Sequence, residues 1–417
     1  MSDASITDDR KARRNVAVLV VVQALGGACA PIAIVLGGIV GHGLLGDDKS
    51  LATLPITAFV VGTACGTLPA GALMRRFGRR AGSVSGLSAG AVGALVSALA
   101  VAIGSFSVLC LGAFLMGYAA AFVQQLRFAA ADTASEAFRP RAISLVLAGG
   151  IAAAIIGPQS VVYAADLVPG IPFAGAYIAA SVMALAAAIV LLFLDIPRQP
   201  RTTGTAAGRP ILEIFRRVDV IVAVGCAASS YAVMNFVMTA APLAMVLHHH
   251  PRDAALLGIQ WHVMAMYGPS FFTGSLIGRF GAERIVFVGL LLLVGCALVA
   301  LAGMSVAHFW GALILLGVGW NFGFIGGSAM LIRTYRPEEK ERVQSTNDFI
   351  IFGLVAMSSL LSGKVLVAGG WDAINIVVLP VVALLLVVLV IRMLSGTAAR
   401  RAAEAATQSE GPQMPPT

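Results

Sequence analysis

Charged side chains are scarce in this chain, because Asp, Glu, Lys and Arg together make up 12% of its 417 residues while 59% are apolar. A water-soluble domain needs roughly 25% charged residues to keep its surface in contact with water. The shortage excludes an ordinary soluble protein and indicates an integral membrane protein.

Groups that bind metals or carry out covalent chemistry are also scarce. The five cysteines lie singly within apolar runs, without metal-ligand spacing, and are best explained as small packing residues. The run 248–250, three histidines, lacks the Cys or carboxylate cluster that would complete a coordination shell. No catalytic triad, phosphate loop or cofactor fingerprint is present. We therefore expect no catalytic residues, no metal, no cofactor and no enzyme activity.

Long apolar runs make up most of the sequence. A helix that crosses a bilayer needs about 20 apolar residues, and twelve such stretches can be drawn. They cover residues 16–40, 51–73, 81–103, 107–130, 141–165, 173–195, 217–246, 256–277, 284–304, 306–332, 345–369 and 372–395. The sequence therefore predicts an all-α membrane protein with twelve transmembrane helices.

Positive charges alternate with these stretches in a way that predicts orientation. With both termini placed in the cytoplasm, Lys49, Arg252 and Lys364 face outward, Arg127 lies within a span, and the other 24 of the 28 Lys and Arg residues lie on the cytoplasmic side. Lys and Arg concentrate in cytoplasmic loops of membrane proteins. We therefore expect a multi-pass protein of the bacterial inner membrane, in contact with membrane lipid and without nucleic-acid partners.

A repeat connects the two halves of the chain. The segment GALMRRFG at 71–78 returns as GSLIGRFG at 274–281, and FRP at 138–140 returns as YRP at 335–337. Duplicated halves that face each other across a pathway are typical of transporters. The predicted units are a six-helix bundle at 1–195, a cytoplasmic linker at 196–216, a pseudo-symmetric six-helix bundle at 217–395 and a disordered cytoplasmic tail at 396–417.

The first copy of the repeat resembles the signature loop of the major facilitator superfamily, Gly-x-Leu-x-Asp-Arg-x-Gly-Arg-Arg/Lys. The matching residues are Gly71, Leu73, Arg76, Gly78, Arg79 and Arg80. This resemblance implies two bundles that rock about a central site, lined by the first, fourth, seventh and tenth spans. It also implies that the loop helps to close the cytoplasmic side.

One position departs from the family pattern. Arg75 occupies the place of the signature Asp, and the second copy has Gly278 there. An acid from elsewhere would have to complete the lock, and Asp132 and Asp348 are both predicted near the cytoplasmic face. Arg75 is equally well explained as one more cation of the cytoplasmic surface.

Polar residues inside the expected lining spans are candidate solute ligands. They are Gln23, Gln124, Arg127, Tyr231, Asn235, Trp320 and Asn321. Amides beside aromatic rings suit a planar, polar, largely uncharged molecule, whose faces stack and whose edges form hydrogen bonds. Arg127 has a second explanation, an ion pair with Asp132 or Glu136, and the amides also suit hydrogen bonding between helices.

These observations predict a secondary transporter that moves a small organic solute by alternating access and acts as a monomer. Within the superfamily, the segments QLRFAAAD at 125–132 and GWNF at 319–322 resemble a bacterial branch of riboflavin importers. That resemblance favours riboflavin uptake. An exporter of drugs or hydrophobic metabolites and a transporter-like membrane sensor are the alternatives.

Overall fold

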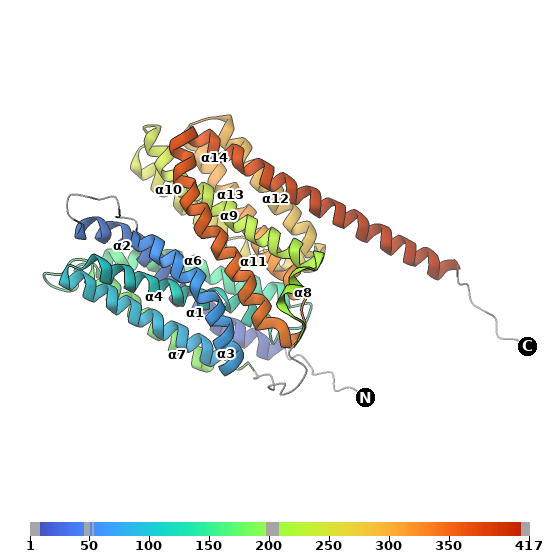
Figure 1. The fold of residues 1–417 in the computed structure, drawn as a ribbon, viewed down its shortest axis with the longest axis horizontal. Helices are drawn as coiled ribbons and strands as arrows, with labels where there is room; N and C mark the ends of the chain where they lie inside the picture. Colours follow the sequence, from blue (N-terminus) through green and yellow to red (C-terminus); the bar gives the residue numbers. More distant parts are fainter. Residues whose placement is uncertain (1–8, 46–50, 52–53, 197–207, 410–417) are drawn as a thin grey trace, which may run out of the picture.

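The computed structural model describes residues 9–45, 51, 54–196 and 208–409, and within these ranges every regular element is a helix (Figure 1). The first half contains α1 (Asp9–Gly27), α2 (Cys29–Leu44), α3 (Leu54–Ile103), α4 (Phe106–Gln124), α5 (Leu126–Ala131), α6 (Arg139–Ala164), α7 (Ala174–Val190) and η1 (Leu191–Phe193). The second half contains α8 (Ile211–Phe215), α9 (Val218–Leu247), α10 (Arg252–Tyr267), α11 (Ser270–Phe280), α12 (Ala282–Ala302), α13 (Val306–Ile332), η2 (Pro337–Glu339) and α14 (Lys340–Ser409). The all-α class expected from the sequence is confirmed.

Two of the helices are longer than a single membrane crossing requires. Nine helical stretches of the described chain are long and apolar enough to span a membrane, and Leu54–Ile103 and Pro337–Leu394 are the longest, with 50 and 58 residues. Each contains one glycine with non-helical backbone, Gly78 (φ 86°) and Gly370 (φ 70°). Both glycines lie where the sequence predicts a boundary between spans. Only glycine adopts such angles readily, which suits it to the turn between two spans.

The repeated glycine of the second half acts in the same way as Gly78. Gly281 (φ 88°) separates α11 from α12, so both copies of the repeat end in a left-handed turn. The span predicted at 256–277 is itself interrupted at Gly268 and Pro269, between α10 and α11. Proline at the start of α11 has no backbone N–H to offer to the preceding turn, which favours a break there.

The tail is more regular than the sequence predicts. The polar segment from residue 396 onward is expected to be disordered, whereas α14 continues as a helix to Ser409. Its Ala-rich run has high intrinsic helix propensity, which does not depend on an apolar face. Residues 410–417 and most of the linker, 197–207, lie outside the described residues.

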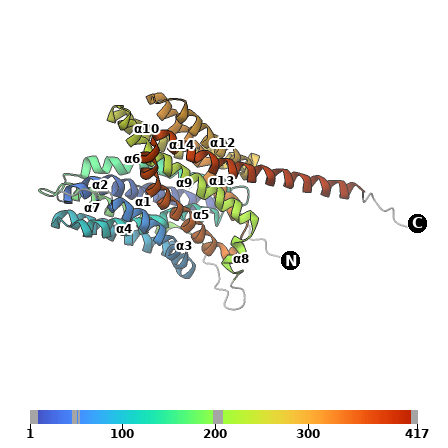
Figure 2. The same ribbon diagram turned by 45° about the horizontal axis from the view of Figure 1, so that its top comes forward.

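Buried apolar side chains group by half. The largest cluster comes from the second half and includes four first-half residues, Phe128, Ala131, Ile143 and Leu147. The other clusters are built from α1 to α7 and η1. Figure 2 shows the two sets of helices from a second direction. The most extensive contacts between the halves are those of α3 with α14 and of α6 with α11.

Glycines set the distance between neighbouring helices in the first half. Cβ atoms added at Gly62 or Gly117 would collide with the backbone of Phe114 or Phe59, so α3 and α4 pack backbone against backbone. Close contact of this kind is how membrane helices gain packing energy where lipid supplies no hydrophobic drive.

Candidate functional site

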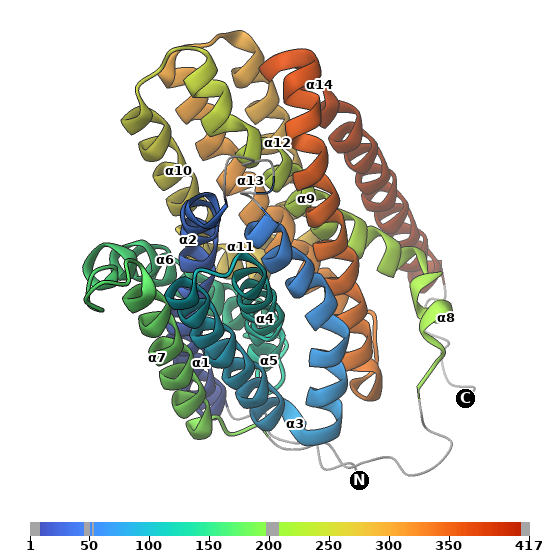
Figure 3. The ribbon, with the colours of Figure 1, turned by 60° about the vertical axis from the view of Figure 1, so that its left-hand side comes forward.

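The two copies of the repeat build the two interfaces between the halves. Gly71 of α3 lies against Ser345 and the backbone of Glu341 in α14, and Gly274 of α11 lies against the backbone of Pro140 and Arg141 in α6. Figure 3 shows α3 beside α14 at this junction. Gly71 therefore meets the helix that follows YRP (335–337), and Gly274 meets the helix that begins within FRP (138–140), each in the opposite half.

Hydrogen bonds reinforce the second of these interfaces. The Ser144 hydroxyl donates to the carbonyl oxygen of Ser270, and the Gly274 N–H donates to the Ser144 oxygen at 3.1 Å. A side chain at residue 274 would displace this backbone contact, so α6 and α11 depend on glycine at this position.

The signature loop takes part in a charge network between the halves. Arg79 forms an ion pair with Asp132 at 2.9 Å, and Lys340 of the second half approaches the same carboxylate at 3.1 Å. Arg79 also donates to Gln125 and to Gln344 of α14. Burial raises the pKa of Asp132, but Arg79 and Lys340 outweigh it and hold that pKa below its ordinary value.

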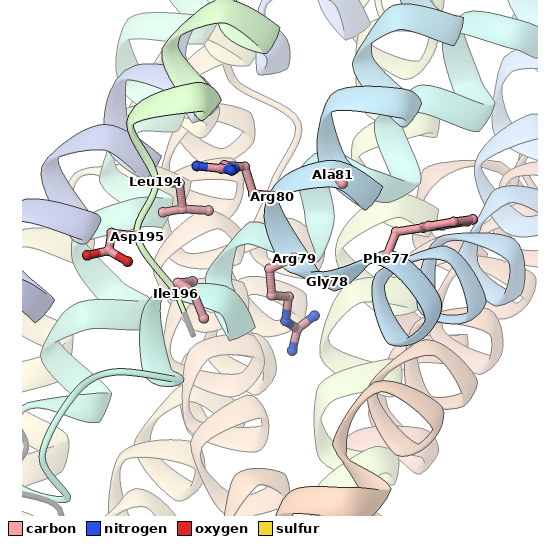
Figure 4. A pocket seen from close by; sticks show the side chains of 8 residues that line it. All are labelled: Phe77, Gly78, Arg79, Arg80, Ala81, Leu194, Asp195 and Ile196. Carbon is pink, nitrogen blue, oxygen red and sulfur yellow. The ribbon is translucent and has the colours of Figure 1, made fainter. Parts of the chain in front are cut away.

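The acid missing from the signature loop is thus replaced from the end of the fourth predicted span. Arg75 is exposed, as are Arg76 and Arg80, and Arg80 donates to the carbonyl oxygen of Leu192 at 3.4 Å. A pocket of about 390 Å³ lies next to the loop. Figure 4 shows residues that line it, among them Gly78, Arg80 and the segment 194–196.

Arg127 pairs with Asp348 rather than with Asp132 or Glu136. Its guanidinium donates to the Asp348 carboxylate, and both side chains are fully buried. Asp348 therefore faces Arg127 and not Arg75. The pair connects α5 of the first half to α14 of the second.

Aromatic rings enclose the Arg127 guanidinium. Its central carbon lies 4.3 Å from the ring centre of Phe128 and 4.5 Å from that of Phe324. A cation in contact with two ring faces gains cation–π stabilisation that is greatest where water is excluded. Arg127 is therefore held by both its carboxylate partner and its aromatic neighbours.

Phe324 belongs to an aromatic cluster between the halves. The cluster consists of Tyr231, Tyr267, Trp320, Phe324 and Phe352, from α9, α10, α13 and α14. Trp320 stacks on Phe324 with centroids 5.1 Å apart, and Tyr231 lies 5.4 Å from Trp320 and 5.1 Å from Phe324. Tyr267 meets Trp320 edge-on, and its ring packs against Gly150 of α6.

The tyrosines of this cluster are half-buried, whereas Trp320 is 1% exposed. The indole N–H of Trp320 is buried without a hydrogen-bond partner. A buried unpaired donor destabilises a protein by about 1–3 kcal/mol, so this N–H lacks a partner that a bound solute would be able to supply.

Two of the predicted amides form hydrogen bonds between helices. Asn321 is buried, donates to the carbonyl of Met266 and to Ser270, and accepts from Thr273, all at 2.6 Å. It fixes α13 to the break between α10 and α11, and both N–H donors of its amide are used within the protein. Asn235 is half-buried and donates to Ser358 at 3.1 Å, which connects α9 to α14.

The predicted glutamines lie in the first half. Gln23 is 6% exposed on α1 and lies beside Gly149 of α6. Gln124 ends α4, and its backbone carbonyl accepts a hydrogen bond from Arg127 at 2.7 Å. The structure thus brings Arg127, Tyr231 and Trp320 into one continuous group of contacts and leaves Gln23 on a different helix pair.

Comparison with known proteins decides the family. A family model described as Major Facilitator Superfamily matches residues 16–299 and 225–414. The chain belongs to the major facilitator superfamily. It is a membrane transporter of a small-molecule solute and not an enzyme.

Several relatives match over almost the full length. Riboflavin transporter RfnT of Brucella anthropi is 47% identical over 390 residues, which cover 93% of this chain and 98% of that protein. The uncharacterized MFS-type transporter YdeG of Bacillus subtilis is 30% identical over 383 residues and 88% of each chain. The superfamily transporter FucP shares the fold, with a TM-score of 0.73 and 17% identity over 90% of this chain and 98% of that one.

Proposed function

We propose that this transporter carries out riboflavin uptake across the bacterial inner membrane by alternating access. The 47% identity to a riboflavin transporter, which covers nearly all of both chains, is the observation that carries this proposal. The aromatic cluster supports it, because stacking rings and unpaired polar atoms suit a planar, uncharged tricyclic ring.

We infer an architecture of twelve spans in two six-helix bundles, residues 1–195 and 217–395, joined by a cytoplasmic linker at 196–216. Dividing α3 at Gly78 and α14 at Gly370, and counting α10 with α11 as one interrupted span, supports this number. Under the proposed orientation the signature loop is cytoplasmic, so the interfaces at Gly71 and Gly274 close the path on the cytoplasmic side.

Accessibility of single cysteines tests the orientation. Ser107 and Glu136 are exposed and lie at opposite ends of the candidate span Phe106–Ala131. In a cysteine-free background, Ser107→Cys should react with an impermeant maleimide added to intact cells, and Glu136→Cys should react only after the membrane is opened. Labelling of Glu136→Cys alone in intact cells would reverse the orientation.

We assign solute contact to the aromatic cluster, which contains Tyr231 and Trp320, together with Gln23, Gln124, Arg127 and Asn235. Tyr231 is the central candidate, because it is half-buried and contacts Trp320, Phe324 and Phe352. Asn321 takes a positioning role, because it holds the helix that carries Trp320. We propose a gate that consists of Gly71, Arg75, Arg76, Gly78, Arg79, Arg80 and Asp348. Asp132 takes the place of the acid that the signature loop lacks.

Tyr231→Ala should weaken riboflavin binding by about 1–2 kcal/mol, or roughly 5- to 30-fold in affinity, because a stacking face and its buried area are lost. Quenching of flavin fluorescence on titration with the purified protein measures this change. Tyr163→Ala is the matched control, since Tyr163 of α6 is 77% exposed. An equal loss of affinity in both variants would remove Tyr231 from the site.

Growth tests the function as a whole. Expression of the protein should allow a riboflavin-auxotrophic bacterium without its own importer to grow on low external riboflavin. Purified protein in liposomes should take up riboflavin. Tyr231→Ala should weaken the apparent affinity for riboflavin in this uptake as it does in the binding titration. A lack of rescue at normal protein abundance in the membrane, together with a lack of flux in liposomes, would overturn the proposal.

A further inference from the structure

The Arg127–Asp348 pair lies directly against the aromatic cluster. One ring, Phe324, separates the guanidinium from Trp320, because it contacts the guanidinium at 4.5 Å and stacks on the indole at 5.1 Å. The same ring contacts Tyr231. Any solute that stacks in this cluster therefore binds close to both charges.

The pair is buried and carries no net charge. Both side chains are 0% exposed, and Coulomb interactions are far stronger there than in water because little solvent screens them. An unpaired guanidinium in such a place would attract an anion strongly, since Arg is the side chain best suited to bind phosphate. Asp348 removes that attraction.

The hydrogen-bonding capacity of the pair is not exhausted by the protein. Arg127 Nε and Asp348 Oδ2 are buried without partners, while Asn347 donates to the other carboxylate oxygen at 3.0 Å. One donor and one acceptor thus stay available to an uncharged polar solute. A phosphate group would instead meet the negative charge of Asp348.

We propose that Asp348 is a specificity-determining residue, which neutralises Arg127 so that the site accepts uncharged flavins and rejects their phosphate esters. The inference rests on the proposed function and deepens it. It assigns to Asp348 a role in solute selection as well as in connecting the halves.

Competition between riboflavin and flavin mononucleotide tests this inference with the purified full-length protein. For the wild type, flavin mononucleotide should displace riboflavin poorly. For Asp348→Asn, the ratio of the two dissociation constants should shift toward flavin mononucleotide by about tenfold or more, equivalent to roughly 1.4 kcal/mol. Asp372→Asn, which removes an acid from an exposed position of the same helix, should behave like the wild type.

A second substitution separates charge selection from a general structural effect. Adding Arg127→Gln to Asp348→Asn removes the cation and should abolish the gain for flavin mononucleotide. An unchanged ratio in Asp348→Asn, with riboflavin still bound, overturns the inference. Failure of the wild type to bind riboflavin would overturn the proposed function instead.

Thermal unfolding provides an independent readout. If Asp348→Asn no longer binds riboflavin measurably, flavin mononucleotide should still raise its unfolding temperature more than riboflavin does, because the phosphate replaces the lost carboxylate. Equal or absent stabilisation by the two flavins contradicts the inference. Asp348→Ser gives a second neutral variant for the same measurements if the Asn variant does not fold.

Discussion

Leucine at Gly71 or at Gly274 is expected to reduce riboflavin uptake by about 5- to 150-fold, because neither interface between the halves has room for a side chain. A Cβ atom at Gly274 would collide with the backbone of Arg141, and one at Gly71 with Ser345 and the backbone of Glu341. Overpacking typically costs about 1–3 kcal/mol. Here the overpacking energy destabilises only the state in which the two halves touch at these interfaces, because each half retains its own core.

Uptake into liposomes measures the loss, and the amount of folded protein in the membrane is measured alongside it. Gly278→Leu is the matched control, because Gly278 lies one turn beyond Gly274 on α11 with no atom within 4 Å of its added Cβ. Wild-type uptake by Gly71→Leu and Gly274→Leu would show that these interfaces do not need to close during transport.

The second large effect is expected at the buried ion pair. Arg127→Leu leaves the Asp348 carboxylate buried without its cation, and breaking a buried pair in this way costs about 3–5 kcal/mol. We therefore expect a large fall in the unfolding temperature of the detergent-purified protein. Adding Asp348→Leu should restore most of the lost stability, because no unpaired charge then remains.

A double-mutant cycle with these variants measures the interaction. Strictly additive losses in Arg127→Leu, Asp348→Leu and the double variant would contradict the pairing. Arg75→Leu is the control for loss of a cation, because Arg75 is exposed and should change stability by a few tenths of a kcal/mol.

Local sequence features predicted the all-α class and the places of three turns between expected spans. The glycines at 78, 281 and 370 mark span boundaries because glycine alone adopts their left-handed angles without strain, and this property is visible in one residue and its neighbours. The repeat also predicted equivalent positions in the two halves. The helical tail to Ser409 was missed because a polar, Ala-rich segment forms a helix without any apolar period.

Contacts between the halves could not be predicted in the same way. Arg127 and Asp348 are 221 positions apart, and the sequence offered Asp132 and Glu136 as nearer partners. Lys340 and Tyr267 were not among the predicted site residues. Lys340 lies at the start of α14, and Tyr267 lies on a span that was not expected to line the pathway. Asn321 was proposed from the sequence as a solute ligand, whereas its amide donates to Met266 and Ser270, and which groups take its hydrogen bonds depends on packing.

The glycine interfaces also bear on how fast the protein can change state. Side chains that become ordered lose up to about 2 kcal/mol each in rotamer entropy, whereas Gly71 and Gly274 contribute no rotamers when α3 meets α14 and α11 meets α6. These two positions therefore add no cost in rotamer entropy to the closing of the surfaces in each transport cycle. The slow step is then expected to be the separation of Arg127 from Asp348 and of Lys340 from Asp132, not the sliding of helices.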